Sequence, residues 1–305
     1  PSVKAVGEGI AEKIFYLTAK TITRTVAEET FSLLSENGMK LKYITLTAKE
    51  KICILEKPQC NPSICPRAHG HFDRVNDAVY DLLTHENHIT REQVSLYAEK
   101  HMVCPFEMGL DTALWTDAVI GDYNYAFDPT SRLKRFFATE KQNDYIFLID
   151  EAHNLVDRAR EMYSAVLTKE DFLALKKEVK KYSRKLTNAI EGCNKQLLEL
   201  KRECENLVRY TPAMIDAFII KLLRLSTVFD EFFQEGISPE RPIPPDTADL
   251  LLNFYFDIRA FLGIYELLDE KYLIYTKHDE NNHFYMKLFC VDPSTNLSER
   301  LAQGR

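Results

Sequence analysis

The chain has 305 residues and a net charge of −7, with 45% hydrophobic and 28% charged residues. This length is enough for two or three domains, each with its own core. No apolar run approaches the roughly 20 residues that a membrane-spanning helix needs, and no signal peptide opens the chain. The acidic balance argues against a uniformly basic nucleic-acid surface. It still permits a local basic groove, because screening limits the reach of each charge to about 10 Å.

The cysteine count points to a reducing compartment. Seven cysteines are an odd number without a secretory signal, which favours free thiols or metal ligands over a disulfide framework. We therefore expect a cytoplasmic protein.

The first fifty residues have the pattern of a βαβ unit. Residues 1–12 resemble the end of a helix, residues 14–18 a short buried strand, and residues 23–37 an amphipathic helix that Asn37 and Gly38 end in the left-handed manner. Residues 43–47 predict a second strand. A strand, a helix and a further strand indicate a parallel sheet.

The character of the chain changes over residues 51–110, where four cysteines appear beside prolines. Irregular chain is followed by helical patterns at 73–83 and 90–100, which predicts a small insertion with the cysteines at its base. Four thiolates suit zinc or an iron–sulfur cluster. Their wide spacing favours a [4Fe–4S] cluster, because a cubane holds its ligands farther apart than a single ion does; unrelated buried thiols are the alternative. The four are Cys53, Cys60, Cys65 and Cys104.

The other sulfur and imidazole groups of the chain have simpler interpretations. His69 and His71 lie near Cys65 and are candidates to replace a ligand, but exposed loop histidines are the simpler reading. The remaining cysteines, Cys193, Cys204 and Cys290, suit small core residues.

A continuous apolar run at 145–149 leads directly into Asp150, Glu151, Ala152 and His153. Such a run is typical of a strand buried on both faces of a parallel sheet, and ligands of these sheets bind at the carboxyl ends of the strands. Adjacent carboxylates there can hold Mg²⁺ and accept a proton from an attacking water. The alternative is an acidic pair that caps the following helix.

The second half of the chain is mostly helical. Apolar residues from 172 to 193 step by threes and fours and predict one long amphipathic helix over 173–208. Further helices are expected at 212–233 and from 246 through 265, and together they predict a separate helical domain. The lysines and arginine between 176 and 185 are a solvated helix face or, alternatively, phosphate contacts. Residues 284–291 predict a strand that rejoins the first sheet.

One expected motif of a nucleotide hydrolase is absent. The phosphate-binding pattern GxxxxGK[ST] occurs nowhere in the sequence. Residues 118–125 predict a strand, and Tyr123 and Asn124 at its end are candidates to contact DNA bases, with aromatic core residues as the alternative.

Taken together, these motifs resemble the XPD/DinG family of iron–sulfur superfamily-two helicases. The sequence DEAH at 150–153 resembles the Walker B box, and YLTAKT at 16–21 resembles motif Ia. The four cysteines ending in CPF at 104–106, followed by VIGDYNY at 119–125 and DP at 128–129, match the family's order. The resemblance covers nearly the whole chain.

The resemblance implies a role for each matching residue. Asp150 would bind Mg²⁺, Glu151 would orient and deprotonate the attacking water, and His153 would link the nucleotide state to the motor. The four cysteines would ligate a [4Fe–4S] cluster, and Thr18, Lys20 and Thr21 would hold the DNA backbone. Family members unwind DNA in the 5′→3′ direction using ATP and Mg²⁺.

The expected architecture is α/β: part of a RecA-like motor domain with a small cluster insertion and a mainly helical Arch domain. We expect motor-domain residues at 1–50 and 113–165, the cluster domain at 51–112, the Arch domain at 166–282, and a return to the motor at 283–305. The missing Walker A pattern predicts that the chain is the central portion of a longer ATP-dependent helicase and is inactive alone.

Two further readings stay open. One is a stand-alone DNA- or protein-binding module without ATPase activity, and the other is a zinc-bearing helical adaptor. Expected partners are single-stranded and forked DNA and other repair or replication proteins. We expect a monomer without membrane contact, of bacterial origin and associated with the nucleoid.

Overall fold

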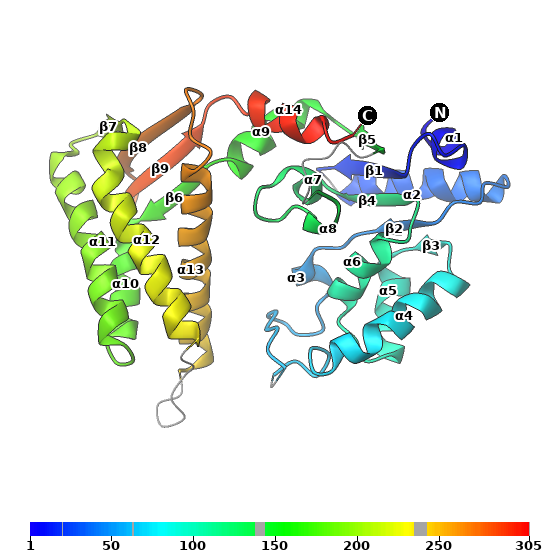
Figure 1. Ribbon diagram of the computed structural model, residues 1–305, viewed down its shortest axis with the longest axis horizontal. Coiled ribbons are helices and arrows are strands. Elements are labelled where there is room, and N and C mark those ends of the chain that lie inside the picture. Colours follow the sequence, from blue (N-terminus) through cyan, green and yellow to red (C-terminus); the bar gives the residue numbers. More distant parts are fainter. Residues whose placement is uncertain (20, 63, 138–143, 235–242, 305) are drawn as a thin grey trace. The chain divides into compact units, whose positions relative to one another are not determined.

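The computed structural model describes residues 1–19, 21–62, 64–137, 144–234 and 243–304, except for the side chains of Thr21 and Ile22. The chain forms two compact units (Figure 1). Unit 1 contains residues 1–156 and 295–305, and unit 2 contains residues 157–294. Among the described residues, none of the helices combines the length and apolar character that crossing a membrane requires.

Unit 1 is built on a parallel sheet, as the sequence predicted, and this sheet has five strands in the order β3-β2-β4-β1-β5. The strands are β1 (Lys13–Thr18), β2 (Tyr43–Thr45), β3 (His88–Ile89), β4 (Ala118–Asp122) and β5 (Tyr145–Ile149). Its helices are α1 (Ser2–Gly7), α2 (Thr21–Glu36), α3 (Lys49–Ile52), α4 (His71–His85), α5 (Arg91–Lys100), α6 (Pro105–Ala113), α7 (Asn124–Phe127), α8 (Lys134–Phe137), α9 (His153–Met162) and α14 (Ser294–Leu301), of which α9 and α14 cross the division between the units.

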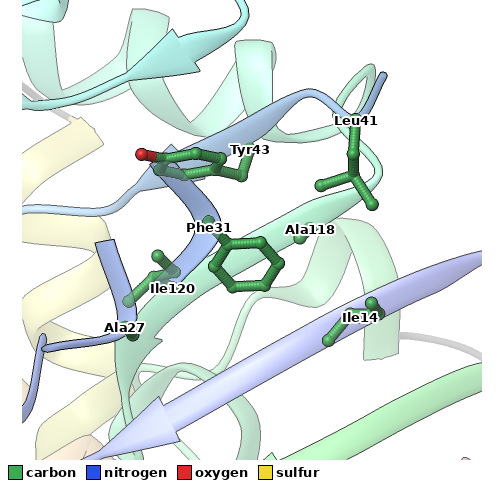
Figure 2. Packing of buried hydrophobic residues seen from close by; sticks show 7 residues of the cluster. All are labelled: Ile14, Ala27, Phe31, Leu41, Tyr43, Ala118 and Ile120. Carbon is green, nitrogen blue, oxygen red and sulfur yellow. The ribbon is translucent and has the colours of Figure 1, made fainter. Parts of the chain in front are cut away.

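One face of this sheet is covered by α2. Ala27 and Phe31 of α2 pack against Ile14, Tyr43 and Ile120 of three neighbouring strands (Figure 2). Fully buried side chains of this kind contribute about 1.5–3 kcal/mol each. The helix ends as expected, because Gly38 has a φ of +93°, which a residue with a Cβ adopts only with strain.

Aromatic rings cover the other side of β1. The ring of Phe15 lies 5.2 Å from Phe136, 5.1 Å from Phe137 and 5.2 Å from Tyr145, measured between centroids. Edge-on and tilted arrangements like these are the favourable geometries for aromatic pairs. They fix α8 against β1.

Unit 2 contains a four-stranded antiparallel sheet of order β6-β9-β8-β7 and four long helices. The strands are β6 (Ala165–Thr168), β7 (Leu207–Tyr210), β8 (Tyr272–His278) and β9 (Phe284–Cys290), and the helices are α10 (Lys169–Val179), α11 (Arg184–Glu203), α12 (Pro212–Gln234) and α13 (Pro245–Tyr265). Helices α10 and α13 pack on the sheet, and α11 and α12 pack alongside them (Figure 1).

The structure corrects the expectation that the strand at 284–291 rejoins the parallel sheet. It is β9, paired with β6 and β8, and the chain returns to unit 1 only at residue 295. Burial alternates along β9, as it does in antiparallel strands with one covered face. A strand of the parallel sheet would read as a continuous apolar run.

The single helix expected over 173–208 is two helices and a strand. Helix α10 ends at Val179, and Ser183 caps α11 by accepting a hydrogen bond from Leu186 N at 3.1 Å. A serine in this position satisfies one of the free N–H groups at a helix start. Apolar periodicity continues through both helices and therefore did not reveal the break.

The expected strand at 118–125 is shorter, ending at Asp122. The basic run in α10 and α11 lies partly in ion pairs, including Lys176 with Glu191 at 2.6 Å.

A buried lysine at the start of β1 links the sheet to α6. Lys13 is 4% exposed, and its ammonium donates to the carbonyl oxygens of Ala113, at 3.1 Å, and Thr116. Burial lowers its pKa from 10.5 to about 8, against the smaller raising effects of Asp117 and Glu12. The last turn of α6 is thereby tied to β1.

The lowered pKa predicts a pH-dependent stability. Between about pH 8 and 10.5 the unfolded chain holds a proton on Lys13 that the folded chain releases, so the free energy of unfolding gains from this group as pH rises. Urea unfolding should show wild type gaining on the order of 2 kcal/mol relative to Lys13→Met over this window. The same comparison with Lys4→Met, an exposed lysine, should show no such gain. Parallel curves for wild type and Lys13→Met would contradict the burial effect.

Candidate nucleotide and cysteine sites

The acidic pair lies at the carboxyl edge of the parallel sheet, where ligands of such sheets bind. Thr18 at the end of β1 is paired with Asp122 at the end of β4. Leu17 is paired with Ile149, and Leu17 O accepts a hydrogen bond from Asp150 N at 2.9 Å. Asp150 therefore leaves its strand beside Thr18.

Glu151 and His153 are on the surface of the turn that follows. Glu151 has a φ of +51°, a left-handed conformation that costs a residue with a side chain about 1 kcal/mol or more and that is concentrated at functional sites. Its Oε2 lies 3.3 Å from His153 Nδ1, and these side chains are 48% and 73% exposed. The three residues are thus brought together, with oxygens open to solvent.

Tyr123 stabilises this turn from beneath. The side chain is fully buried, and its hydroxyl donates to the carbonyl oxygen of Asp150 and to that of Glu151, the latter at 3.1 Å. Burial raises the pKa of Tyr123, and the carboxylates of Asp150, Glu151 and Asp122 raise it further. Its ring has no exposed face on which a base could stack, so the structure does not place Tyr123 on a DNA-binding surface.

The other DNA-binding candidates differ in how exposed they are. Thr18 is 1% exposed, and its hydroxyl is hydrogen-bonded to that of Thr23. Lys20 lies outside the described residues, as does the side chain of Thr21. Asn124 is partly exposed at the start of α7, where its N–H donates to Asp122 Oδ1 at 3.0 Å.

Gly121 lies within the same edge. A Cβ there would lie 2.9 Å from the ring of Tyr125, so only glycine allows this close approach. Burial raises the pKa of Tyr125 to about 12, and Arg24 opposes that rise. The supporting roles of Tyr123, Gly121 and Tyr125 were missed in the sequence, although all three lie within the VIGDYNY segment.

The four cysteines line a single cavity of about 340 Å³. Cys60 is exposed, Cys65 is buried, and Cys53 and Cys104 are intermediate. Among the described residues, no three His, Cys, Asp or Glu side chains come close enough together to hold one metal ion. The four cysteines thus line one cavity, and their thiols do not meet at a single point among the described residues.

Cys104 is held in place by contacts with two helices. It caps the start of α6, and its N–H donates to His71 Nδ1 at 3.2 Å. Burial raises the pKa of the Cys104 thiol, while the backbone N–H groups of Glu107 and Phe106 partly lower it. Contrary to the expectation of an exposed loop histidine, His71 is buried at the start of α4, and burial lowers its pKa.

Lys49 adds a positive charge to the cavity. Burial lowers its pKa, but Cys60, Glu107 and Cys104 outweigh this, so that the net shift is upward. The ammonium also lies 5.3 Å from the centroid of the Phe106 ring. The cavity thus places a positively charged side chain beside the cysteines.

The sequence motifs and the parallel sheet resemble those of the XPD/DinG-type superfamily-two helicases, and comparisons with known proteins agree with this resemblance. A family model, DEAD_2, matches residues 17–172, which is about half of the chain. The chain belongs to the DEAD_2 family.

Individual relatives agree with this assignment. The ATP-dependent DNA helicase CHL1 of Candida albicans is 25% identical over 197 residues, covering 56% of this chain and 22% of that protein. Two solved structures are similar at 12% identity: an XPD helicase, with a TM-score of 0.52 over 99% of this chain and 52% of that one, and a truncated XPD, with a TM-score of 0.56 over 98% and 82%. The chain thus spans about a fifth of the curated relative and about half of the first of these structures.

The bonds of Tyr123 to the turn generate a prediction. Tyr123→Phe removes the donor that serves the carbonyls of Asp150 and Glu151 and should lower the free energy of unfolding by about 1–3 kcal/mol. Hydrogen exchange at residues 150–154 should accelerate.

The matched control is Tyr80→Phe, at a side chain that is 72% exposed, which should change stability by no more than about 0.5 kcal/mol. Equal effects of the two substitutions would show that Tyr123 does not hold the turn.

Proposed function

We propose that the chain supplies the DEAH-box and cysteine-bearing part of an ATP-dependent DNA helicase that moves 5′→3′ on single-stranded DNA. The placement of Asp150 and Glu151 at the carboxyl edge of the parallel sheet carries the proposal. The partly buried outermost strand β5 delivers both carboxylates to the position where this class of sheet binds phosphates and Mg²⁺. A helix cap would not need the left-handed turn that presents Glu151 to solvent.

Each residue of the turn has a chemical role in this proposal. Asp150, nearest the strand, holds Mg²⁺ through water. Glu151 orients and deprotonates the attacking water, because its carboxylate is free to accept a proton. His153, 3.3 Å from Glu151, responds to the charge of that carboxylate and so transmits the nucleotide state.

We further propose that Cys53, Cys60, Cys65 and Cys104 ligate a [4Fe–4S] cluster. The cavity that all four cysteines line supports a shared site, and their wide spacing in the sequence favours a cluster over a single zinc ion. When bound, the group would join the 53–65 loop to the start of α6. Lys20 and Thr21, which follow β1 in the sequence, and Asn124 at the start of α7 are proposed to contact the DNA backbone.

Two other functions compete with this proposal. A stand-alone binding module would use the sheet only as scaffold, and a zinc-bearing adaptor would use the cysteines without the carboxylates. The left-handed Glu151 favours the helicase, since neither alternative has a use for it. Repair or replication of DNA, with forked substrates and partner proteins, is the proposed setting.

The cluster proposal predicts a difference between two cysteine variants. Chain prepared without oxygen should contain about four iron and four sulfide per molecule and absorb near 400 nm. Cys104→Ala should lose most of the iron and loosen α6 in hydrogen exchange while α11 stays protected. Cys193→Ala, at a buried thiol of unit 2, should keep its iron. Zinc without iron in the wild-type chain would refute the cluster.

The catalytic proposal concerns hydrolysis of ATP. In a protein that joins these residues to a phosphate-binding loop and a second motor domain, Glu151→Gln should lower DNA-stimulated hydrolysis by about 10²-fold or more, as expected for loss of a general base. Glu161→Gln, at an exposed position of α9, should leave the rate unchanged. The 305 residues alone should not hydrolyse ATP. A DNA-stimulated rate from them that Glu151→Gln abolishes would contradict this expectation.

A further inference from the structure

The sheet of unit 2 has one covered and one uncovered face. Along β8 and β9, every second residue is buried beneath the helices, including Thr276, Phe284 and Met286, each at 0% exposure. The intervening residues point away from α10 and α13, because successive side chains of a strand lie on opposite faces. This second set, the outer face, is partly or fully exposed.

The outer face alternates cations with aromatic rings. The pairing of the strands places Arg209 beside Tyr275 and Tyr275 beside Lys287, so that the three form one row across β7, β8 and β9. In the next row Lys277 lies beside Tyr285. Side chains directly opposite each other on one face are about 5 Å apart, so each ring has a cation as its neighbour.

Ring contacts within the outer face leave stacking surfaces available. Tyr275 and Tyr285 lie 6.2 Å apart with an interplanar angle of 69°, an edge-to-face arrangement that leaves ring faces uncovered. Lys287 Nζ lies 5.1 Å from the ring centroid of Phe289, a cation–π contact that holds the ammonium close to the sheet surface.

The charge of the outer face has a single sign. Every residue of the four strands is described, and the outward positions contain three cations and no carboxylate. In a chain with a net charge of −7, such a face is a local exception. It is complementary to a polyanion.

We propose that the outer face of the β6-β9-β8-β7 sheet binds single-stranded nucleic acid. Unpaired bases would stack on Tyr275 and Tyr285, and phosphates would contact Arg209, Lys277 and Lys287. Sheets that carry exposed aromatics bind single strands in this way, because every base has a stacking face and the backbone follows the cations. Acidic protein segments are less well matched, since they offer no stacking partner for the tyrosines.

This binding site stands on the residues of unit 2 and extends the proposed function without depending on it. It adds a contact for the strand outside the motor sheet and needs neither ATP nor a cluster. Its test can therefore fail while the helicase proposal holds, and the reverse is equally possible.

Fluorescence anisotropy of a labelled fifteen-nucleotide thymidine strand with the full chain tests the site. Tyr275→Ala and Tyr285→Ala should each weaken binding about tenfold, the change that corresponds to loss of one stacked base. Tyr275→Phe should bind like wild type, because it keeps the ring. Lys287→Gln should reduce the slope of log affinity against log salt by about 0.7, the value for one phosphate contact on a single strand.

Matched controls lie elsewhere in unit 2. Phe256→Ala removes an aromatic side chain of α13 that is 55% exposed, and Lys195→Gln removes an exposed charge of α11. Both should leave the affinity and the salt slope unchanged. Photocrosslinking with 4-thiothymidine should label peptides from 272–290. The same binding assay with an RNA strand shows whether the Tyr275-dependent binding prefers RNA or DNA.

Three results would overturn the proposal. The first is wild-type affinity in both alanine variants, and the second is crosslinking confined to unit 1. The third is equal competition by a duplex of the same length, because paired bases cannot stack on the rings. Displacement by a glutamate-rich peptide with dependence on Lys287 but not on the tyrosines would assign the face to an acidic protein instead.

Discussion

The parallel pairing of β1 on both sides is the constraint on which unit 1 depends. Its register with β4 and β5 brings Thr18, Asp122 and Asp150 to one edge of the sheet. A slip of one residue would turn each side chain to the opposite face, separating Phe15 from its aromatic partners and Asp150 from Tyr123. The position of the carboxylates therefore depends on the same register that packs β1 in the core.

The same strand also reaches the cysteine cavity through α6. This helix begins at Cys104, is joined to α8 by ion pairs from Glu107 and Asp111 to Arg135, and ends at the carbonyls that Lys13 of β1 contacts. A buried ammonium that serves two carbonyls is costly to disrupt, because removing it leaves buried acceptors unpaired. A group bound by Cys104 would therefore be connected, through α6, to both α8 and β1.

Local patterns in the sequence were sufficient for the individual strands β1, β2 and β5 and for the end of α2 at Gly38, since each depends on residues close together in the chain. They were insufficient where pairing partners are distant. The sequence of 284–290 does not indicate that this strand pairs with β6 and β8. Its partial alternation of apolar and polar residues did, however, argue against a strand buried on both faces. The buried role of Tyr123 was equally hidden, because its two acceptors lie 27 and 28 residues further along the chain.

The parallel sheet presents negative charges and the antiparallel sheet presents positive charges, and the places where they do so follow from which faces of each sheet are covered. A parallel sheet covered on both faces can present polar groups only at its edge, and here that edge collects the carboxylates Asp122, Asp150 and Glu151, which suit a cation. An antiparallel sheet covered on one face can present side chains across the other, and here that face collects Arg209, Lys277 and Lys287 among aromatic rings. A chain with an acidic balance can in this way present both an acidic edge and a basic face, because solvent screens each over about 10 Å.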